Sequence, residues 1–257
     1  MERVSRLMDI IALHNLKGGV GKTATAVNLA DQAARAGVPT LLWDLDAQAA
    51  ATWCVGAAPG LARPPAKLFR RKSPIGRETV RTRQTYLDLL PADGSLRQLD
   101  DLIDKGKDGA RLLDRLLQPF SENYGLVVLD CPPSFSRLAD AVVRVATRVL
   151  CPLIPAPLSL NAWRQMVARF DRGRYGRDTL RPFLSMVDRR RGLHRRWSEA
   201  PPTSLRHCLR TGIPYSTDIE QMSVHRQPLA AFAPRATATE AYRRLWLELA
   251  GDIEIRP

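Results

Sequence analysis

The sequence predicts an α/β protein with a mostly parallel, twisted sheet covered by helices on both faces. Short apolar, β-branched runs alternate along the chain with stretches of helical apolar spacing, a glycine-rich loop joins the first run to the first helix, and two runs end in aspartate. A chain of 257 residues can bury one large core, so we expect a single domain over residues 1–257. In such folds ligands bind beyond the carboxyl ends of the strands.

The first two predicted strands flank the glycine-rich loop. Residues 9–14 form an apolar, β-branched run that suits a buried parallel strand. From Lys22 the apolar residues follow helical spacing, and Gly37 followed by Pro39 predicts the end of this helix. Residues 40–46 form the second predicted strand, which carries two carboxylates at its end.

The later elements continue the same alternation. From residue 57 to 83 proline, glycine and basic residues crowd together, which predicts loops with short helices and leaves the role of the basic segment 63–83 open. The remaining predicted strands are 86–90, 126–130, 149–154 and 183–187. Helical spacing predicts helices around 112–117 and over 161–170 and 237–249.

Composition and charge narrow the function classes. Lys and Arg outnumber Asp and Glu by 39 to 26, a net charge of +13, which makes polyanions candidate partners, although an arginine-rich chain can also reflect the base composition of its genome. No apolar run approaches the ~18 to 20 residues that span a bilayer, and the first nine residues lack the apolar core of a secretory signal, so we expect a cytoplasmic protein. The four cysteines lie far apart without a C-x-x-C pair, which favours reduced thiols over a metal site.

Residues 17–23, KGGVGKT, lie between the first strand and the first helix, where a phosphate-binding loop is expected. The glycines let backbone N–H groups close on phosphate oxygens, and the helix N-terminus adds partial positive charge. Lys22 is expected to pair with the β and γ phosphates of ATP, and the Thr23 hydroxyl to bind Mg²⁺. The expected nucleotide-binding residues of the loop are Lys17, Gly18, Gly19, Val20, Gly21, Lys22, Thr23 and Ala24.

The loop departs from a standard P-loop in a way that carries information. Leu16 stands where a first glycine is usual, and Lys17 adds a second lysine. The loop therefore resembles the deviant Walker A motif, K-G-G-x-G-K-[ST], of the ParA and MinD superfamily of P-loop ATPases. The segment 41–52, LLWDLDAQAAAT, is similar to that family's LLxDxDPQGxxT stretch except for Ala47 in place of proline, and 126–134, LVVLDCPPS, is similar to its Walker B stretch.

Two further segments extend the resemblance, which runs from about residue 9 to 249. Residues 186–188 resemble a stretch that ParA proteins carry after a late strand, and 212–214 resemble the turn beside their adenine, so Met186, Asp188 and Pro214 are expected at the nucleotide. The resemblance also implies an ATP-dependent sandwich homodimer, in which Lys17 reaches the phosphates of the partner subunit. It implies that Lys17, Lys22 and Asp46 are catalytic, with Asp46 orienting the attacking water.

Aspartates at strand ends are the other candidates for the magnesium site. Asp130 ends the strand expected beside the loop, where a carboxylate can hold a Mg²⁺-bound water. Asp44 points the same way as Asp46 by the strand period of two and is either an outer Mg²⁺ group or a helix cap. Capping is also the alternative for Asp46 and Asp130. The candidate metal residues are Thr23, Asp46 and Asp130, with Asp44 open.

Members of the superfamily share the ATPase and differ in what the dimer contacts, so three classes remain. A ParA-like ATPase binds nonspecific nucleoid DNA and positions a plasmid, a chromosome or a protein body such as a carboxysome, as McdA does, with hydrolysis stimulated by a ParB-like or McdB-like partner. A MinD-like ATPase needs a basic amphipathic C-terminal helix, which the acidic residues after 251 do not provide, so no membrane contact is expected. Metabolic synthetases are the third class, and the amidating ones tend to lack the early lysine. We favour the first, with a nucleoid-associated location.

One departure bears on DNA binding. ParA proteins commonly carry an arginine four residues after the proline of the adenine turn, whereas this chain has Asp218, whose charge repels phosphate. DNA contacts would then fall to other arginines, although a solvated surface is the alternative for the cluster at 189–196. The candidate DNA-binding residues are Arg189, Arg190, Arg191, Arg195, Arg196 and Arg226.

Overall fold

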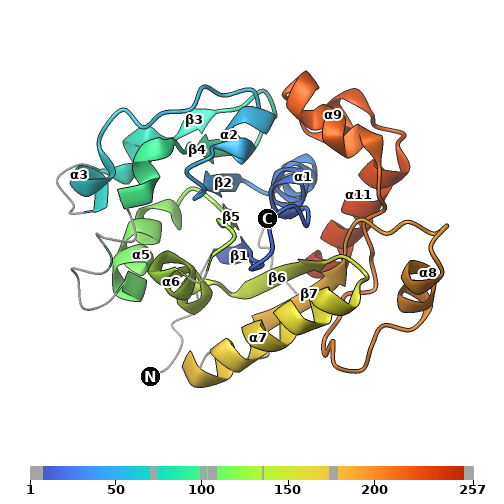
Figure 1. The fold of residues 1–257 in the computed structure, drawn as a ribbon. Helices are drawn as coiled ribbons and strands as arrows, with labels where there is room; N and C mark the ends of the chain where they lie inside the picture. The colour runs from blue at the N-terminus through green and yellow to red at the C-terminus, as the bar shows by residue number, and fades with distance from the viewer. Residues whose placement is uncertain are drawn as a thin grey trace.

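The computed structural model describes residues 8–69, 74–98, 103, 109–134, 136–173 and 179–251. A seven-stranded sheet has the order β3-β4-β2-β5-β1-β6-β7 and is parallel except for the pair β3–β4 (Figure 1). The strands are β1 (Asp9–Leu13), β2 (Thr40–Asp44), β3 (Val80–Arg81), β4 (Leu87–Leu90), β5 (Leu126–Asp130), β6 (Arg148–Leu153) and β7 (Leu180–Leu184). The predicted α/β fold with a mostly parallel sheet is confirmed.

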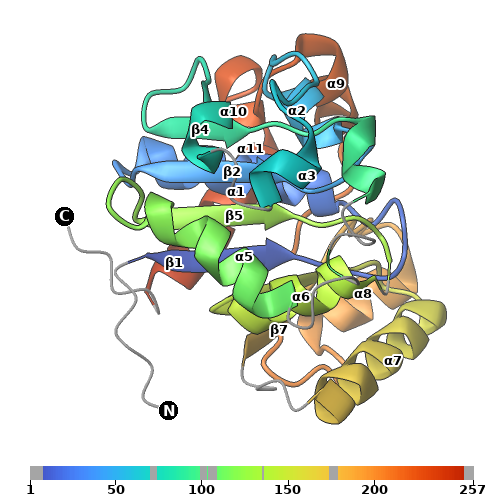
Figure 2. The ribbon, with the colours of Figure 1, turned by 90° about the vertical axis from the view of Figure 1, so that its left-hand side faces the viewer.

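Helices cover both faces of this sheet, with α1 and α11 on one side and α5, α6 and α7 on the other (Figure 2). The α-helices are α1 (Lys22–Arg35), α2 (Ala50–Cys54), α3 (Pro65–Phe69), α5 (Gly109–Leu117), α6 (Arg137–Val145), α7 (Pro157–Gly173), α8 (Gly192–Glu199), α9 (Thr217–His225), α10 (Leu229–Phe232) and α11 (Thr237–Ala250). Short 3₁₀ turns are η1 (Ile75–Glu78), η2 (Gly94–Gln98) and η3 (Gln118–Phe120).

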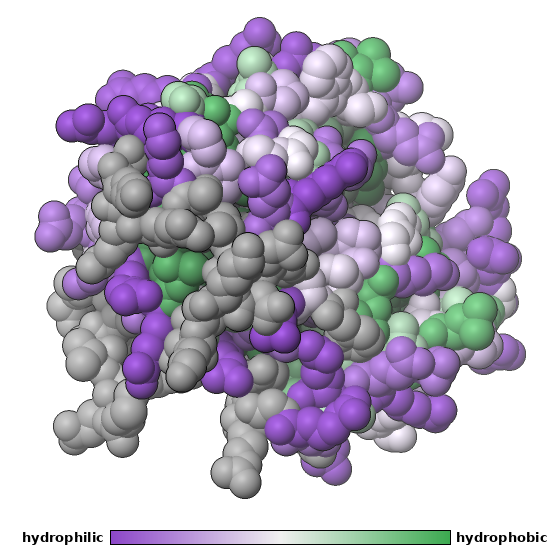
Figure 3. Space-filling model, turned by 60° about the vertical axis from the view of Figure 1, so that its left-hand side comes forward, coloured by the Kyte–Doolittle hydropathy of each residue, from purple (hydrophilic) through white to green (hydrophobic). Residues whose placement is uncertain are grey.

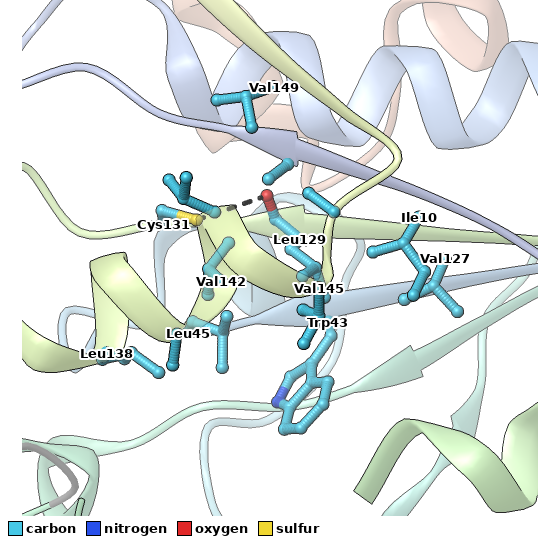
Figure 4. Close-up of a cluster of buried hydrophobic side chains, with 14 of the residues drawn as sticks. Ile10, Trp43, Leu45, Val127, Leu129, Cys131, Leu138, Val142, Val145 and Val149 are labelled. Carbon is cyan, nitrogen blue, oxygen red and sulfur yellow. Dashed lines mark hydrogen bonds between the residues drawn. The ribbon is translucent and has the colours of Figure 1, made fainter. Parts of the chain in front are cut away.

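Each face of the sheet has its own apolar core. On the face of α5, α6 and α7, Ile10, Trp43 and Leu129 from three neighbouring strands meet Val142 and Val145 of α6 (Figure 4). The alternate strand residues point to the opposite face and pack against α1 and α11. Because the central strands are buried on both sides, they read as continuous apolar runs, which is why the sequence reveals them.

Most predicted strands are found within a residue or two, and β7 is the main exception among them, whereas the predicted helix 161–170 is found as the longer α7, Pro157–Gly173. Strand β7 spans Leu180–Leu184, three residues before the predicted run 183–187. Arg181 and Pro182 interrupt the apolar run, and Met186 has a left-handed φ of 52°, which ends the strand. Val187 instead forms an isolated bridge with Pro214.

The second difference lies at the sheet edge and in the basic segment. The two-residue strand β3 pairs antiparallel with β4 and was not predicted, since its residues are exposed and too few to show a pattern. Short helices occur between 57 and 83 as predicted, but residues 70–73 of the basic segment lie outside the described residues. Within the described part of that segment, Arg63 lies 3.7 Å from the buried Glu78.

The surface agrees with the high charge of the chain. In Figure 3 hydrophilic side chains cover most of the described surface in view, and apolar ones show only as small separate areas. Among the described residues, no helix combines the length and the apolar character needed to cross a lipid bilayer.

Candidate nucleotide site

The glycine-rich loop leaves the carboxyl end of β1 and enters α1, at the centre of the sheet. Asn15 fixes its start, because its amide donates to the Pro152 carbonyl (2.7 Å) while its side-chain oxygen accepts the Lys17 N–H (3.0 Å). Gly19 and Gly21 have φ angles of 67° and 91°, a region that glycine enters without strain. The sequence analysis missed Asn15, whose only signal is a buried amide directly after a strand.

The backbone N–H groups of this loop are the next feature of the site. Between Gly18 and Ala24 no backbone N–H donates to another residue that the structure describes, and the first that does is that of Thr25, to the Gly21 carbonyl (3.0 Å). The Thr25 hydroxyl adds a second bond to the same carbonyl (2.7 Å). A run of free N–H groups at a helix N-terminus fits an anion such as phosphate.

The two lysines of the loop occupy different environments. Lys22 is only 7% exposed, and its ammonium donates to the Lys17 carbonyl (3.3 Å) across the loop. Burial lowers the pKa of Lys22, and the charge of Asp130 offsets part of this effect. The Lys17 side chain is exposed instead. Thus one ammonium faces into the loop and the other lies on the surface, where a second subunit could meet it.

Asp130 lies at the end of β5, paired in register with Leu13 of β1 and Asp44 of β2. Its side chain is fully buried, and neither carboxylate oxygen has a hydrogen-bond partner among the described residues. Burial, assisted by the charge of Asp44, raises the pKa of Asp130 to about 8, and the nearby Thr23 hydroxyl and the Lys22 ammonium offset only part of this. A buried carboxylate without donors fits an additional cation or a cation-bound water.

Asp44 has partners for both oxygens. One oxygen accepts the Thr52 N–H and the Thr52 hydroxyl (both 2.8 Å), and the other accepts the Asp46 N–H (3.1 Å). Burial raises the pKa of Asp44 to about 6, and the Thr52 hydrogen bonds oppose the increase. These contacts favour the capping interpretation of Asp44, because they anchor α2 to the end of β2.

Asp46 lies beyond the strand, in the turn that leads to α2, and is half-buried. One oxygen accepts the Gln48 N–H (2.9 Å), and the Asp46 carbonyl accepts the Ala49 N–H (2.8 Å). The turn ends at Ala49, which has a left-handed φ of 55°. The backbone thus holds the carboxylate in place and leaves its other oxygen available.

The predicted adenine segments come together beyond β7. The Val187 N–H donates to the Ile213 carbonyl (3.0 Å), and the Tyr215 N–H donates to the Val187 carbonyl (3.1 Å), so Met186 and Pro214 become neighbours. The Asp188 carboxylate binds the Arg190 guanidinium through both oxygens (2.9 and 3.0 Å). That guanidinium lowers the pKa of Asp188 to about 2.

Ser185 is a second residue that the sequence analysis missed. It is buried, and its hydroxyl lies 3.0 Å from where a Cβ on Gly21 would be. Replacing Gly21 by alanine is therefore expected to destabilise the protein by about 1–3 kcal/mol, since it combines strain at φ 91° with this close approach. Denaturant unfolding of the nucleotide-free protein measures the effect. Gly18→Ala is the matched control, because no atom lies within 4 Å of its Cβ position, and an equal loss in both variants would contradict this explanation.

The candidate DNA-binding arginines fall into two groups. Arg189, Arg190, Arg191, Arg195 and Arg196 are exposed at and before α8. Arg226 lies elsewhere: its guanidinium donates to the Ala57 carbonyl (2.7 Å) and stacks 4.0 Å from the centre of the Trp53 ring. The Trp53 indole in turn donates to the Ser223 carbonyl (2.8 Å), so these residues join α2 to α9.

Asp218 lies in the first turn of α9. Its backbone N–H donates to the hydroxyl of Ser216, the residue that caps this helix (3.2 Å). An acidic residue at this position also stabilises the positive end of the helix dipole. The local role of Asp218 is therefore to support the start of α9.

The described residues contain no group of three or more His, Cys, Asp and Glu side chains arranged around a metal ion.

Comparisons with known proteins agree with this geometry. A family model described as an AAA domain matches residues 8–179, well over half of the chain. The chain is 28% identical over 250 residues to the chromosome partitioning protein ParA of Myxococcus xanthus, covering 93% of this chain and 87% of that protein.

Two solved structures show the same fold at low identity. The ATP complex of a variant of Cyanothece McdA has a TM-score of 0.80 at 18% identity and covers 98% of this chain and 100% of that chain. Cobyrinic acid a,c-diamide synthase from Mycobacterium smegmatis, with a bound ATP analogue and magnesium, has a TM-score of 0.79 at 22% identity. The match covers 95% of this chain and 94% of that chain. Because the loop between β1 and α1 carries the additional lysine Lys17, and because of these matches, the chain belongs to the ParA/MinD family of deviant Walker A P-loop ATPases.

Proposed function

We propose that this protein is a ParA-type ATPase whose ATP-bound dimer binds nonspecific DNA and positions a cargo in the cell. The observation that carries the proposal is the division of the two loop lysines, with Lys22 buried beside Asp130 and Lys17 exposed on the surface. The relative from Myxococcus xanthus is named for chromosome partitioning, which supports a role of this kind.

ATP with Mg²⁺ is the proposed ligand of residues 17–24. The free N–H groups from Gly18 to Ala24 would hold the phosphates, and Thr23 and Asp130 would hold the metal and its water. Mg²⁺ would neutralise phosphate charge and orient the terminal phosphoryl group. Asp46, fixed by its turn, would accept a hydrogen bond from the attacking water, and Met186, Asp188 and Pro214 would border the adenine.

In this proposal, Lys17 makes dimerisation of the subunits depend on bound ATP. Because its side chain is exposed, it is available to reach across a subunit interface to the partner's nucleotide. Two subunits closed on ATP also bring two basic surfaces together, and DNA affinity rises steeply with the number of phosphate contacts. Intrinsic turnover is expected to be slow and to need a ParB-like or McdB-like partner.

The test is retention on random-sequence DNA with ATP–Mg²⁺, with ADP–Mg²⁺ and without nucleotide. Retention is expected with ATP only, with affinity falling steeply as salt increases. Equal retention in all three conditions would contradict the nucleotide switch. Binding to anionic liposomes in place of DNA would favour the membrane class.

Asp46→Ala is expected to bind ATP, to remain a dimer and to hydrolyse ATP at least about 100-fold more slowly, because the proposed water-orienting oxygen is removed, together with the oxygen that accepts the Gln48 N–H. Size-exclusion chromatography with ATP and phosphate release measure the two effects. The matched control is Asp114→Ala, an aspartate on α5 outside the site. Wild-type hydrolysis by Asp46→Ala would assign the water to another residue.

A further inference from the structure

A cavity of about 560 Å³ lies at the β7 edge of the sheet, away from the phosphate loop. Its walls come from the end of β7 and the residues just after it, from the last turn of α8, from the segment 201–214 that follows α8, and from α11. Figure 1 shows this segment curving around α8 beside β7 and α11. The volume is within the range of pockets that bind small organic ligands, about 300–1,000 Å³.

The outer wall of this cavity is firmly attached to the fold. The Leu209 N–H donates to the Pro182 carbonyl of β7 (2.8 Å), and the Trp163 indole of α7 donates to the Ser204 carbonyl (2.9 Å). The Glu248 carboxylate of α11 accepts the N–H groups of Arg210 and Thr211 (2.7 and 2.9 Å). Because three elements hold it, the segment forms a preformed wall.

The cavity is separate from the phosphate loop. No residue of the loop lines it, and Ser185, whose hydroxyl lies near Gly21, does not line it either. It does share Val187, Gly212 and Pro214 with the segments 186–188 and 212–214 that are predicted to border the adenine. The two sites therefore meet along these two segments.

The lining combines an apolar surface with arginines. Leu184, Leu209 and Ala241 supply apolar surface, while Arg189, Arg210 and Arg244 come from three separate segments. Arg244 is bound to Glu240 (2.9 Å), whereas the guanidinium groups of Arg189 and Arg210 have no ion pair with a described residue. Free guanidinium groups beside an apolar wall suit a flat organic molecule that carries a phosphate, sulfonate or carboxylate.

We propose that this cavity binds a small organic anion of about nucleotide size, distinct from the nucleotide at the phosphate loop. A ligand there contacts Val187 and Pro214 directly, so its occupancy changes the packing of the adenine turn and with it the affinity for ATP. This regulatory step rests on the proposed function of the phosphate loop, whereas the binding itself does not.

The probe is anilinonaphthalene sulfonate, an aromatic sulfonate whose fluorescence rises in apolar sites, titrated into the full chain saturated with ADP–Mg²⁺. One saturable site is expected. Arg210→Ala is expected to weaken it about tenfold, equivalent to about 1.4 kcal/mol, and Arg210→Lys to weaken it less. Ala241→Phe, which places an aromatic ring inside the cavity, is expected to block it. Arg164→Ala, an exposed arginine of α7 outside the lining, is the control and should bind as wild type does.

The remaining outcomes separate this proposal from the proposed function. Lys22→Ala, titrated without nucleotide beside nucleotide-free wild type, should keep the probe site while losing ATP, and loss of both would place the probe at the phosphate loop and overturn the cavity proposal. Competition of the probe by ADP would overturn it in the same way. If Arg210→Ala weakens DNA retention but leaves the probe titration unchanged, the arginine belongs to a DNA surface, and the cavity proposal is wrong.

Discussion

Lys22→Ala is expected to abolish measurable ATP binding, with affinity lowered at least about 100-fold. The Lys22 ammonium is only 7% exposed and lies where the loop closes, so its bond to a phosphate oxygen would be charge-assisted and shielded from water. No other lysine is buried in the described loop, and Lys17 is exposed. Isothermal titration with ATP–Mg²⁺ measures the loss.

The control for this variant is Lys67→Ala, which removes an exposed lysine of α3 outside the loop. It should bind ATP with wild-type affinity. Circular dichroism and thermal unfolding establish that both variants are folded. ATP affinity in Lys22→Ala within a few-fold of wild type would show that the loop does not bind phosphate through this lysine.

Asp130→Asn is expected to stabilise the nucleotide-free protein by at least about 2 kcal/mol at pH 8 and to abolish Mg²⁺-dependent hydrolysis. A buried carboxylate without hydrogen-bond partners costs stability when ionised, and an isosteric amide removes the charge. Removing the carboxylate also removes the group proposed to hold the metal-bound water. A variant that is more stable but inactive would identify Asp130 as a residue kept for function rather than for stability.

The contribution of Asp130 to folding stability depends on pH, and the sign of this dependence follows from its pKa. The folded-state pKa of Asp130 is about 8 against an ordinary value of 3.8, so the folded protein binds a proton that the unfolded chain releases between these pH values. Stability is then fully present below pH 3.8 and lost as the pH rises toward 8, by on the order of 5 kcal/mol as an upper bound.

Other buried groups titrate in the same pH range. The informative quantity is therefore the difference in the free energy of unfolding between Asp130→Asn and the wild type. Burial raises the pKa of Asp44 to about 6, which acts in the same direction. Burial and the Lys22 charge lower the pKa of His14 to about 4, which acts in the opposite direction between pH 4 and 6.5. Urea unfolding of both proteins from pH 5 to 8.5 isolates Asp130. A constant difference across this range would show that its carboxyl is already ionised at pH 5.

The sequence predicted the sheet and the loop because their physical signals are local. Strands such as Leu126–Asp130 are buried on both faces and read as continuous apolar runs, and the loop needs glycine at Gly19 and Gly21 for its left-handed φ angles. Of the strand order, the sequence predicted only that the strand ending at Asp130 lies beside the loop, and β5 does pair with β1.

What the sequence did not predict depends on contacts between distant residues. Asn15 reaches Pro152 and Asn28 reaches the Leu229 N–H (2.9 Å), across sequence separations that carry no local pattern. The free oxygens of Asp130 and the engaged oxygens of Asp44 look alike in the sequence, since both aspartates end a buried strand. Their difference arises from Thr52, which lies eight residues beyond Asp44.

The link between α2 and α9 has a mechanical consequence. The short helix α2 begins just after Asp46, and α9 begins just after Pro214, so Trp53 and Arg226 connect the turn of the proposed water-orienting residue to the helix that follows the proposed adenine turn. A shift of the Asp46 turn therefore has to carry α9 with it or break the indole bond to Ser223 and the guanidinium bond to Ala57. The proposed catalytic turn and the proposed adenine turn are thus linked through side chains at the outside of the molecule, in addition to any link through the sheet.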